Sequence, residues 1–168
     1  EKFRKITQWE QPFKIRLEKE IPIGAGLGGG SSDAATTLKL LTKIPNSPSI
    51  NHVELFEIAS KLGADVPVCL HGKTTRMQGI GGKLKILQPL PRLPIVLVNP
   101  NFRLETKNVF MAFNGDYSEP IDSCLLEKPW SQEKLKDLLT STQQNDLYEA
   151  AVSLAPEISE VLTLLREL

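Results

Sequence analysis

A glycine-rich segment with two serines is the part of this sequence best suited to bind a ligand. It consists of Pro22, Ile23, Gly24, Ala25, Gly26, Leu27, Gly28, Gly29, Gly30, Ser31 and Ser32. Glycines let the backbone approach a ligand closely and adopt positive φ without a clash at Cβ. A helix that begins here would turn its first N–H groups and the positive end of its dipole toward an anion. The serine hydroxyls could add ligands for a phosphate oxygen or a magnesium ion. We therefore predict a phosphate-binding loop.

Other interpretations of this loop fit less well. A simple turn before a serine-capped helix would not require so many glycines, because each loses extra entropy on folding. A Walker-type loop has a lysine directly after its last glycine, whereas Lys39 lies about two turns inside the predicted helix. A dinucleotide loop fits the glycine spacing, but it also requires an acidic residue about twenty positions later. The chain has Asn46 and Ser47 there, and no strand is predicted.

Asp65 is the second candidate for chemistry. It precedes Val66 and Pro67, a pattern typical of a residue that caps a short helix. From this pattern alone, the capping role is favoured over a catalytic one. His52 and His71 have no nucleophile or paired ligand nearby in the sequence, so we assign them no catalytic role.

Periodicity predicts the elements around these residues. Alternating apolar and charged residues over 13–18 favour a half-buried strand. Helices are predicted over 31–41 and 53–62, and two strands over 73–78 and 83–87 are joined by a glycine-bearing turn. The apolar run 95–98 is typical of a buried strand. Further helices are predicted over 106–113, 131–140, 145–154 and 156–168.

The proline-rich segment 89–94 is the best domain boundary. We therefore predict an α+β protein with one domain over 1–92 and a second over 93–168. Lys+Arg and Asp+Glu both number 20, which argues against a dedicated nucleic-acid or anionic-membrane binder. Cys69 and Cys124 fit no metal-ligand spacing, and two thiols of this kind favour a reducing, cytoplasmic location.

The glycine segment, continued through Asp33, Ala34 and Ala35, closely resembles the second motif of the GHMP kinases. Further segments also resemble that family and follow one another in the same order as in its members. The likeness therefore spans nearly the whole chain. They are residues 62–67, 79–84, 96–100, 106–110 and 145–147. The triple glycine and double serine look most like the members of the family that phosphorylate a cytidine diphosphate derivative in isoprenoid precursor biosynthesis.

The resemblance implies the GHMP-kinase two-domain architecture, with a nucleotide-binding domain, a substrate-binding domain and the active site in the cleft between them. It implies that residues 22–32 wrap the phosphates of ATP, with Mg²⁺ as the companion cation. Asp65 would be the general base that takes the proton from a 2-hydroxyl of the small-molecule substrate. The resemblance favours the role of general base over that of helix cap for Asp65. One side chain could fill both roles.

Two residues of the second domain are implied on the substrate side. Thr106 and Phe110 would contact the substrate, with Phe110 stacked on the cytosine ring. Each has a plainer interpretation that stays open. Phe110, at helical spacing from Val109 and Phe113, is by default a core residue, and Thr106 could simply cap a helix.

The chain also departs from the family pattern. Gly82 stands where the family usually has a glutamate. The family's N-terminal strands, which bring a lysine and an aromatic–histidine pair, and its third glycine-rich motif have no counterpart here. We therefore expect both domains to be incomplete and these 168 residues alone to be weak or inactive. Two alternatives stay open: another GHMP kinase with a different acceptor, and a non-catalytic nucleotide-binding remnant.

Overall fold

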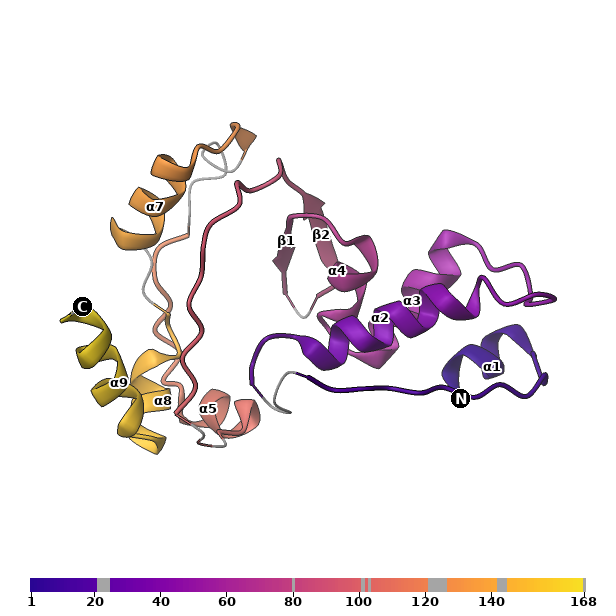
Figure 1. Cartoon of the computed structure of the whole chain (residues 1–168), viewed down its shortest axis with the longest axis horizontal. Helices are drawn as coiled ribbons and strands as arrows, with labels where there is room; N and C mark the ends of the chain where they lie inside the picture. Colours follow the sequence, from indigo (N-terminus) through magenta and orange to yellow (C-terminus); the bar gives the residue numbers. More distant parts are fainter. Residues whose placement is uncertain are drawn as a thin grey trace. The chain divides into compact units, whose positions relative to one another are not determined.

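The computed structural model describes residues 1–20, 25–79, 81–100, 102, 104–120, 127–141 and 145–167. It consists of two compact units: unit 1, Glu1–Leu87, and unit 2, Gln88–Leu168 (Figure 1). Helices and a small antiparallel sheet confirm the predicted α+β class. The assignment of residues 1–92 and 93–168 to a nucleotide domain and a substrate domain stays a prediction.

Unit 1 carries four helices and one hairpin among its described residues. In order, they are α1 (Lys2–Thr7), α2 (Gly29–Leu41), α3 (His52–Leu62), α4 (Val66–His71), β1 (Thr75–Gln78) and β2 (Lys83–Ile86). The predicted helices and the two predicted hairpin strands are confirmed to within two residues at each end. Helix α1, which was not predicted, contains one buried residue, Phe3.

Helix α3 has a well-defined start and end. A capping box closes its first turn: the Asn51 side chain accepts a hydrogen bond from the amide of Glu54 at 2.9 Å, and the Glu54 carboxylate accepts one from the amide of Asn51 at 3.0 Å. At the other end, Gly63 is the C-cap, and its φ of 169° is extended rather than left-handed. This extended residue leads the chain directly into the segment that carries Asp65.

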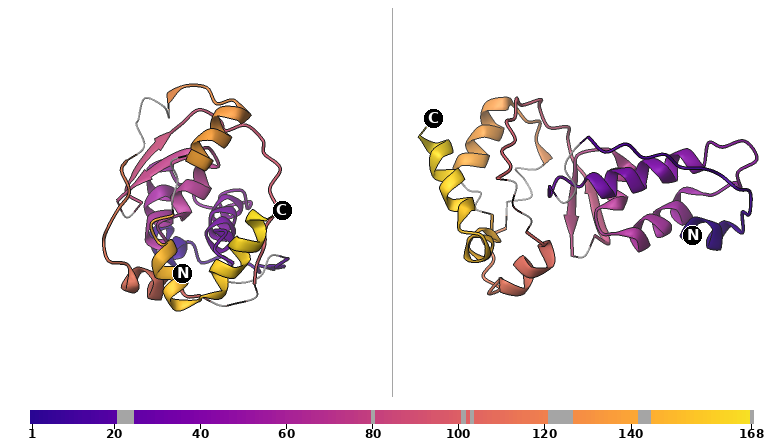
Figure 2. Two further views of the ribbon diagram at one scale, coloured as in Figure 1. Left: turned by 90° about the vertical axis from the view of Figure 1, so that its left-hand side faces the viewer. Right: turned by 60° about the horizontal axis from the view of Figure 1, so that its bottom comes forward.

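The core of unit 1 lies where α2, α3 and α4 pack together (Figure 2). Ile58 and Ala59 of α3 are completely buried. Apolar residues at helical spacing on the other two helices meet them; these are Ala35, Leu38 and Leu41 of α2 and Val66 and Leu70 of α4. The helix that follows the glycine loop and the helix that follows Asp65 therefore share one packed core.

The predicted strand over 13–18 is wrong. Residues 10–20 have no regular secondary structure, and the side chains of Ile15 and Leu17 are more than half exposed. A half-buried strand needs a neighbouring strand, and the described part of the chain contains only the two-stranded β1–β2 sheet. Phe13 instead stacks on Trp9, with ring centroids 5.4 Å apart, and Trp9 meets Phe3 edge to face.

The hairpin is antiparallel, with Thr75 opposite Ile86 and Gln78 opposite Lys83. Gly79 and Gly81, in the turn between the strands, have φ of 63° and 90°, in the left-handed region that favours glycine. The turn is therefore built as the sequence predicted.

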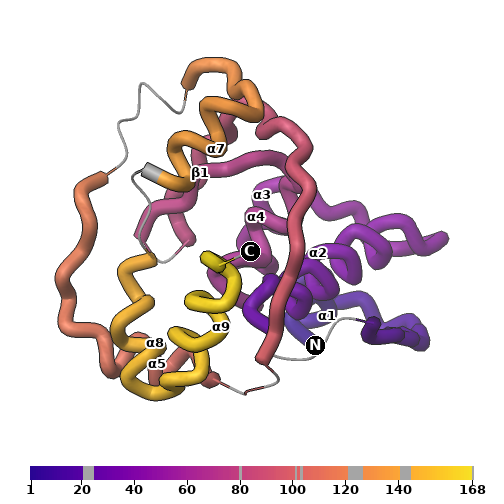
Figure 3. The backbone as a smooth tube through the Cα atoms, turned by 60° about the vertical axis from the view of Figure 1, so that its left-hand side comes forward, coloured from indigo at the N-terminus to yellow at the C-terminus, as the bar shows by residue number. Residues whose placement is uncertain are grey.

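Unit 2 is helical in its described part. It contains α5 (Thr106–Ala112), α7 (Gln132–Ser141), α8 (Tyr148–Leu154) and α9 (Glu157–Arg166), which confirms the four predicted helices. Helix α8 packs against both α5 and α9 (Figure 3). The predicted strand over 95–98 is wrong, because these residues pair with no described strand and their side chains are 49–85% exposed.

Candidate functional site

The glycine loop leads directly into α2. Pro22, Ile23 and Gly24 lie outside the described residues, and the loop is described from Ala25 onward. Gly26 has φ of 73°, and Gly28, the N-cap of α2, has φ of 68°. Side chains other than glycine rarely adopt these values, so the path of the loop itself requires glycine at these two positions.

The first turn of α2 offers backbone donors that its own chain does not use. The first hydrogen bond of the helix runs from the amide of Ser32 to the carbonyl of Gly28, at 2.9 Å. Within the described residues, the amides of Gly29, Gly30 and Ser31 have no acceptor, and no side chain caps the helix. The hydroxyls of Ser31 and Ser32 make no hydrogen bond to described residues either. Free amides at the positive end of a 13-residue helix are suited to an anion.

Gly30 has no conformational or steric reason within the described chain to be glycine. Its φ is not in the left-handed region, and a Cβ at this position would meet no atom within 4 Å. Glycine inside a helix is less stable than alanine by about 0.5–1 kcal/mol. The open space beside Gly30 therefore suits an external group that approaches the backbone closely.

Lys19, which was not predicted as a site residue, lies beside the loop. The Lys19 ammonium forms an ion pair with the Asp33 carboxylate of α2, and both side chains are about one-third exposed. The same ammonium nitrogen lies 3.9 Å from the position that a Cβ on Gly29 would occupy. Lys19 precedes the loop rather than following it, so a search for Walker spacing does not find it.

Asp65 is exposed and holds the N-cap position of α4, but its side chain makes no capping hydrogen bond. The predicted position at the start of a short helix is therefore confirmed, but the side-chain capping bond is not formed. Its carboxylate forms no hydrogen bond or ion pair within the described chain. The backbone around it is well held: the amide of Cys69 donates to the carbonyl of Asp65 at 3.1 Å, and Val66 and Pro67 are buried.

The structure places two of the predicted site elements in unit 1 and the third in unit 2. The glycine loop and Asp65 both belong to unit 1, where α2 packs directly against α4. Thr106 and Phe110 belong to unit 2. An active site between the two domains therefore stays a prediction.

Thr106 is not a helix cap and Phe110 is not a core residue, contrary to the plainer interpretation of each. The N-cap of α5 is Glu105, so Thr106 is the first residue of the helix rather than its cap. Phe110 is 57% exposed, whereas its neighbour Val109 is the buried residue of α5. Phe110 is therefore an exposed residue of α5 and not part of its buried core.

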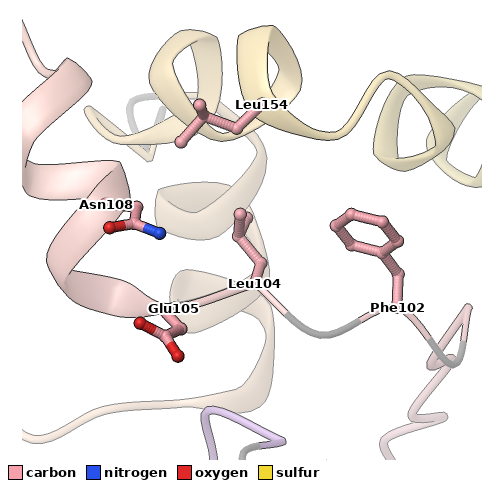
Figure 4. Close-up of a pocket in the computed structure, with 5 residues that line it drawn as sticks. All are labelled: Phe102, Leu104, Glu105, Asn108 and Leu154. Atoms are coloured by element: carbon pink, nitrogen blue, oxygen red, sulfur yellow. The ribbon is translucent and has the colours of Figure 1, made fainter.

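A cavity of about 390 Å³ lies at the start of α5 (Figure 4). It is lined by Phe102, Leu104, Glu105, Asn108 and Leu154. In Figure 4 the Asn108 and Leu104 side chains face the open space, and Leu154 reaches it from α8. These residues were not predicted, because ordinary side chains next to a helix start carry no distinctive signal in the sequence.

The segment 145–147, the weakest of the family-like motifs, has a structural role. The Asn145 side chain accepts a hydrogen bond from the amide of Leu147 at 3.1 Å, in a turn that leads into α8. The Asp146 carboxylate accepts one from the amide of Ser118 at 3.2 Å. The second of these bonds connects the start of α8 to the segment after α5.

Two further observations concern the described residues only. No group of three or more His, Cys, Asp or Glu side chains is arranged to hold a metal ion. No helix among them is long and apolar enough to cross a membrane. Cys69 is a half-buried free thiol, and Cys124 lies outside the described residues.

Comparison with known proteins adds independent findings. Residues 1–73 match the family model described as the GHMP kinases N terminal domain. The chain is 44% identical to a 4-diphosphocytidyl-2-C-methyl-D-erythritol kinase of Chelativorans sp., over 99% of this chain and 55% of that relative. It is 41% identical to the protein of the same name from Rhodospirillum rubrum, over 92% of this chain and 50% of the relative.

A solved structure shows the same similarity. The crystal structure of a 4-(cytidine 5'-diphospho)-2C-methyl-D-erythritol kinase matches with a TM-score of 0.70 and 35% identity, over 89% of this chain and 53% of that one. The present chain thus spans about half the length of the curated relatives it matches.

Proposed function

Because the chain belongs to the GHMP kinase family, we propose that it forms the centre of an ATP-dependent small-molecule kinase. The proposed reaction transfers the γ-phosphate of ATP to the 2-hydroxyl of 4-diphosphocytidyl-2-C-methyl-D-erythritol, in isoprenoid precursor biosynthesis. Relatives of that name, about 40% identical along nearly the whole chain, support this choice of acceptor.

The start of α2 is the observation that carries the proposal. Among the described residues, three adjacent amides have no acceptor and two serine hydroxyls have no partner, and these groups lie on one helix turn with the open space beside Gly30. A triphosphate satisfies all of these groups at once, because its oxygens accept hydrogen bonds from the amides and its charge opposes the helix dipole. Lys19 adds a positive charge beside the same turn.

Asp65 acts on the acceptor in this proposal. Phosphoryl transfer depends on positioning and on neutralisation of charge more than on covalent catalysis. A carboxylate within hydrogen-bond reach of the 2-hydroxyl orients it and takes its proton as the oxygen attacks the γ-phosphorus. The absence of any other partner for the Asp65 side chain within the described chain leaves it available for this task.

Magnesium belongs to the proposal as the companion of ATP. Mg²⁺ is usually held by substrate phosphates together with one or two protein groups and several waters. Ser31 and Ser32 offer hydroxyl oxygens near the proposed phosphate position. These oxygens, together with the carboxylate of Asp33 on the same helix, would supply such protein groups.

Thr106 and Phe110 serve the acceptor side of the proposal. The exposed ring of Phe110 offers a stacking face for cytosine, and Thr106 lies one helical turn before it on α5. This role requires the acceptor to contact unit 2 in the complete protein.

The test uses the protein expressed from the complete reading frame that encodes this chain. We expect release of one ADP for each 4-diphosphocytidyl-2-C-methyl-D-erythritol phosphorylated, dependent on Mg²⁺. Release of ADP only with a different alcohol or phosphate acceptor would replace the proposed substrate with another of the same family. Binding of ATP without transfer to any acceptor of the family would favour a non-catalytic nucleotide-binding remnant.

A further inference from the structure

The turn of the β1–β2 hairpin touches the backbone next to Asp65. Gly81 is buried, and a Cβ at its position would lie 2.7 Å from the carbonyl oxygen of Ala64 and 3.1 Å from its Cα. Real Cβ atoms do not approach other atoms at the first of these distances, and the obstacle is backbone that cannot rotate away. The hairpin and the Ala64 peptide therefore meet this closely only because residue 81 lacks a side chain.

The other two glycines of this turn do not share the contact. Gly79 also has a left-handed φ, of 63°, but a Cβ there would meet no atom within 4 Å. Gly82 has neither a left-handed φ nor a close neighbour. The tight approach is therefore specific to Gly81 and is not a general consequence of the tight turn.

We infer that Gly81 is a positioning residue for Asp65, an inference that rests on the proposed kinase function. Within the described chain, the Asp65 carboxylate has no partner of its own, so its location is set by the backbone that carries it. Ala64 and Asp65 form the turn between the C-cap of α3 and the first turn of α4. The amide of Val66 spans this turn with a hydrogen bond of 3.2 Å to the carbonyl of Gly63. The Gly81 contact supports it from outside.

An added methyl group at residue 81 must disturb this support in one of two ways. If the hairpin holds its place, the Ala64 peptide moves away and carries Asp65 with it. If the hairpin moves instead, the turn loses the surface against which it rests. Catalytic groups need placement to within about 0.5 Å, and a displacement near 1 Å can cost about 100-fold in rate. Both outcomes therefore lower the rate of the transfer step.

The experiment compares Gly81→Ala, Gly79→Ala and Gly82→Ala in the complete protein. Gly79→Ala also places alanine at a positive φ, 63° against 90° at Gly81, but without the close contact, and Gly82→Ala introduces neither. We expect Gly81→Ala to lower kcat about 10- to 100-fold per folded molecule, with the KM for ATP changed less than about twofold. We expect both control variants to keep kcat within about twofold of wild type. Circular dichroism establishes the folded fraction of each variant.

A double variant separates positioning from a merely structural role. In an Asp65→Asn background, Gly81→Ala should reduce the residual kcat only slightly, because the carboxylate that it displaces is already absent. An equal fold-loss in both backgrounds, or a kcat for Gly81→Ala no lower than that of Gly79→Ala, would overturn the inference. A wild-type protein that transfers no phosphate would instead count against the proposed function.

Discussion

At the scale of single residues, Asp65 is the proposed catalytic base. Its carboxylate has no partner within the described chain and is therefore free to act on the acceptor. A structural aspartate at this position would cap α4, but the side chain makes no such bond. Sequence pattern alone favoured the cap, and only the family resemblance pointed to the base. The pattern failed because it identifies which residue precedes a helix, not where the side chain of that residue points.

We expect Asp65→Asn in the complete protein to lower kcat by about 100- to 10,000-fold, since an amide cannot accept the proton of the acceptor hydroxyl. ATP affinity should change little, because the proposed phosphate ligands lie on the glycine loop. Steady-state kinetics and ATP titration measure the two effects. Glu57→Gln, which removes an exposed carboxylate of α3, is the matched control and should leave kcat and ATP affinity unchanged. Near-normal turnover in Asp65→Asn would remove Asp65 from the role of base.

Gly30→Ala tests the loop, because it should raise the stability of the fold and lower the affinity for ATP. Alanine is the better helix former and no described atom obstructs it, so the folded protein should gain up to about 1 kcal/mol. The same methyl group should intrude on the bound triphosphate and weaken ATP binding by about tenfold or more, which corresponds to about 1.4 kcal/mol. Urea unfolding and isothermal titration measure the two changes. Unchanged ATP affinity would contradict the phosphate-binding role of this turn.

At the scale of elements, the shared core of α2, α3 and α4 fixes the loop and Asp65 in one unit. Helical periodicity predicted α2 and α3 well, because each places buried residues such as Leu38 and Ile58 on one side. The strands expected over 13–18 and 95–98 did not form. Their patterns indicate residues that could pair in a sheet, but a strand also requires a partner that a local pattern cannot supply.

Ile58→Ala tests this core. Removing a completely buried side chain should cost about 2–5 kcal/mol of stability, because it loses apolar burial and leaves a cavity. Val53→Ala is the control on the same helix: Val53 is 66% exposed, so its truncation should cost no more than about 0.5 kcal/mol. Denaturant unfolding followed by circular dichroism measures both. Equal effects would show that α3 does not pack as described.

At the scale of the whole molecule, the proposed chemistry requires both units. The nucleotide elements lie in unit 1 and the proposed substrate residues in unit 2. The sequence predicted a boundary from the proline-rich segment 89–94, close to the division after Leu87. The cavity beside Glu105 and Asn108 was not predicted, because it is assembled from segments far apart in the sequence, including Leu154.

Phe110→Ala tests the contribution of unit 2. Loss of a stacking ring should weaken binding of the cytidine substrate by about 1–3 kcal/mol, seen as a higher KM for that substrate with the KM for ATP unchanged. Met111→Ala is the matched control, because Met111 is an exposed neighbour on the same helix. An unchanged KM in Phe110→Ala would place cytosine elsewhere.

The most direct test is a crystal structure of the complete protein with a non-hydrolysable ATP analogue, Mg²⁺ and the cytidine diphosphate acceptor. We predict that the amides of Gly29, Gly30 and Ser31 donate to phosphate oxygens. The Asp65 carboxylate should lie about 2.6–3.2 Å from the acceptor hydroxyl, which in turn faces the γ-phosphorus. A triphosphate bound away from the start of α2, or an Asp65 carboxylate remote from the γ-phosphorus, would contradict the proposed kinase mechanism.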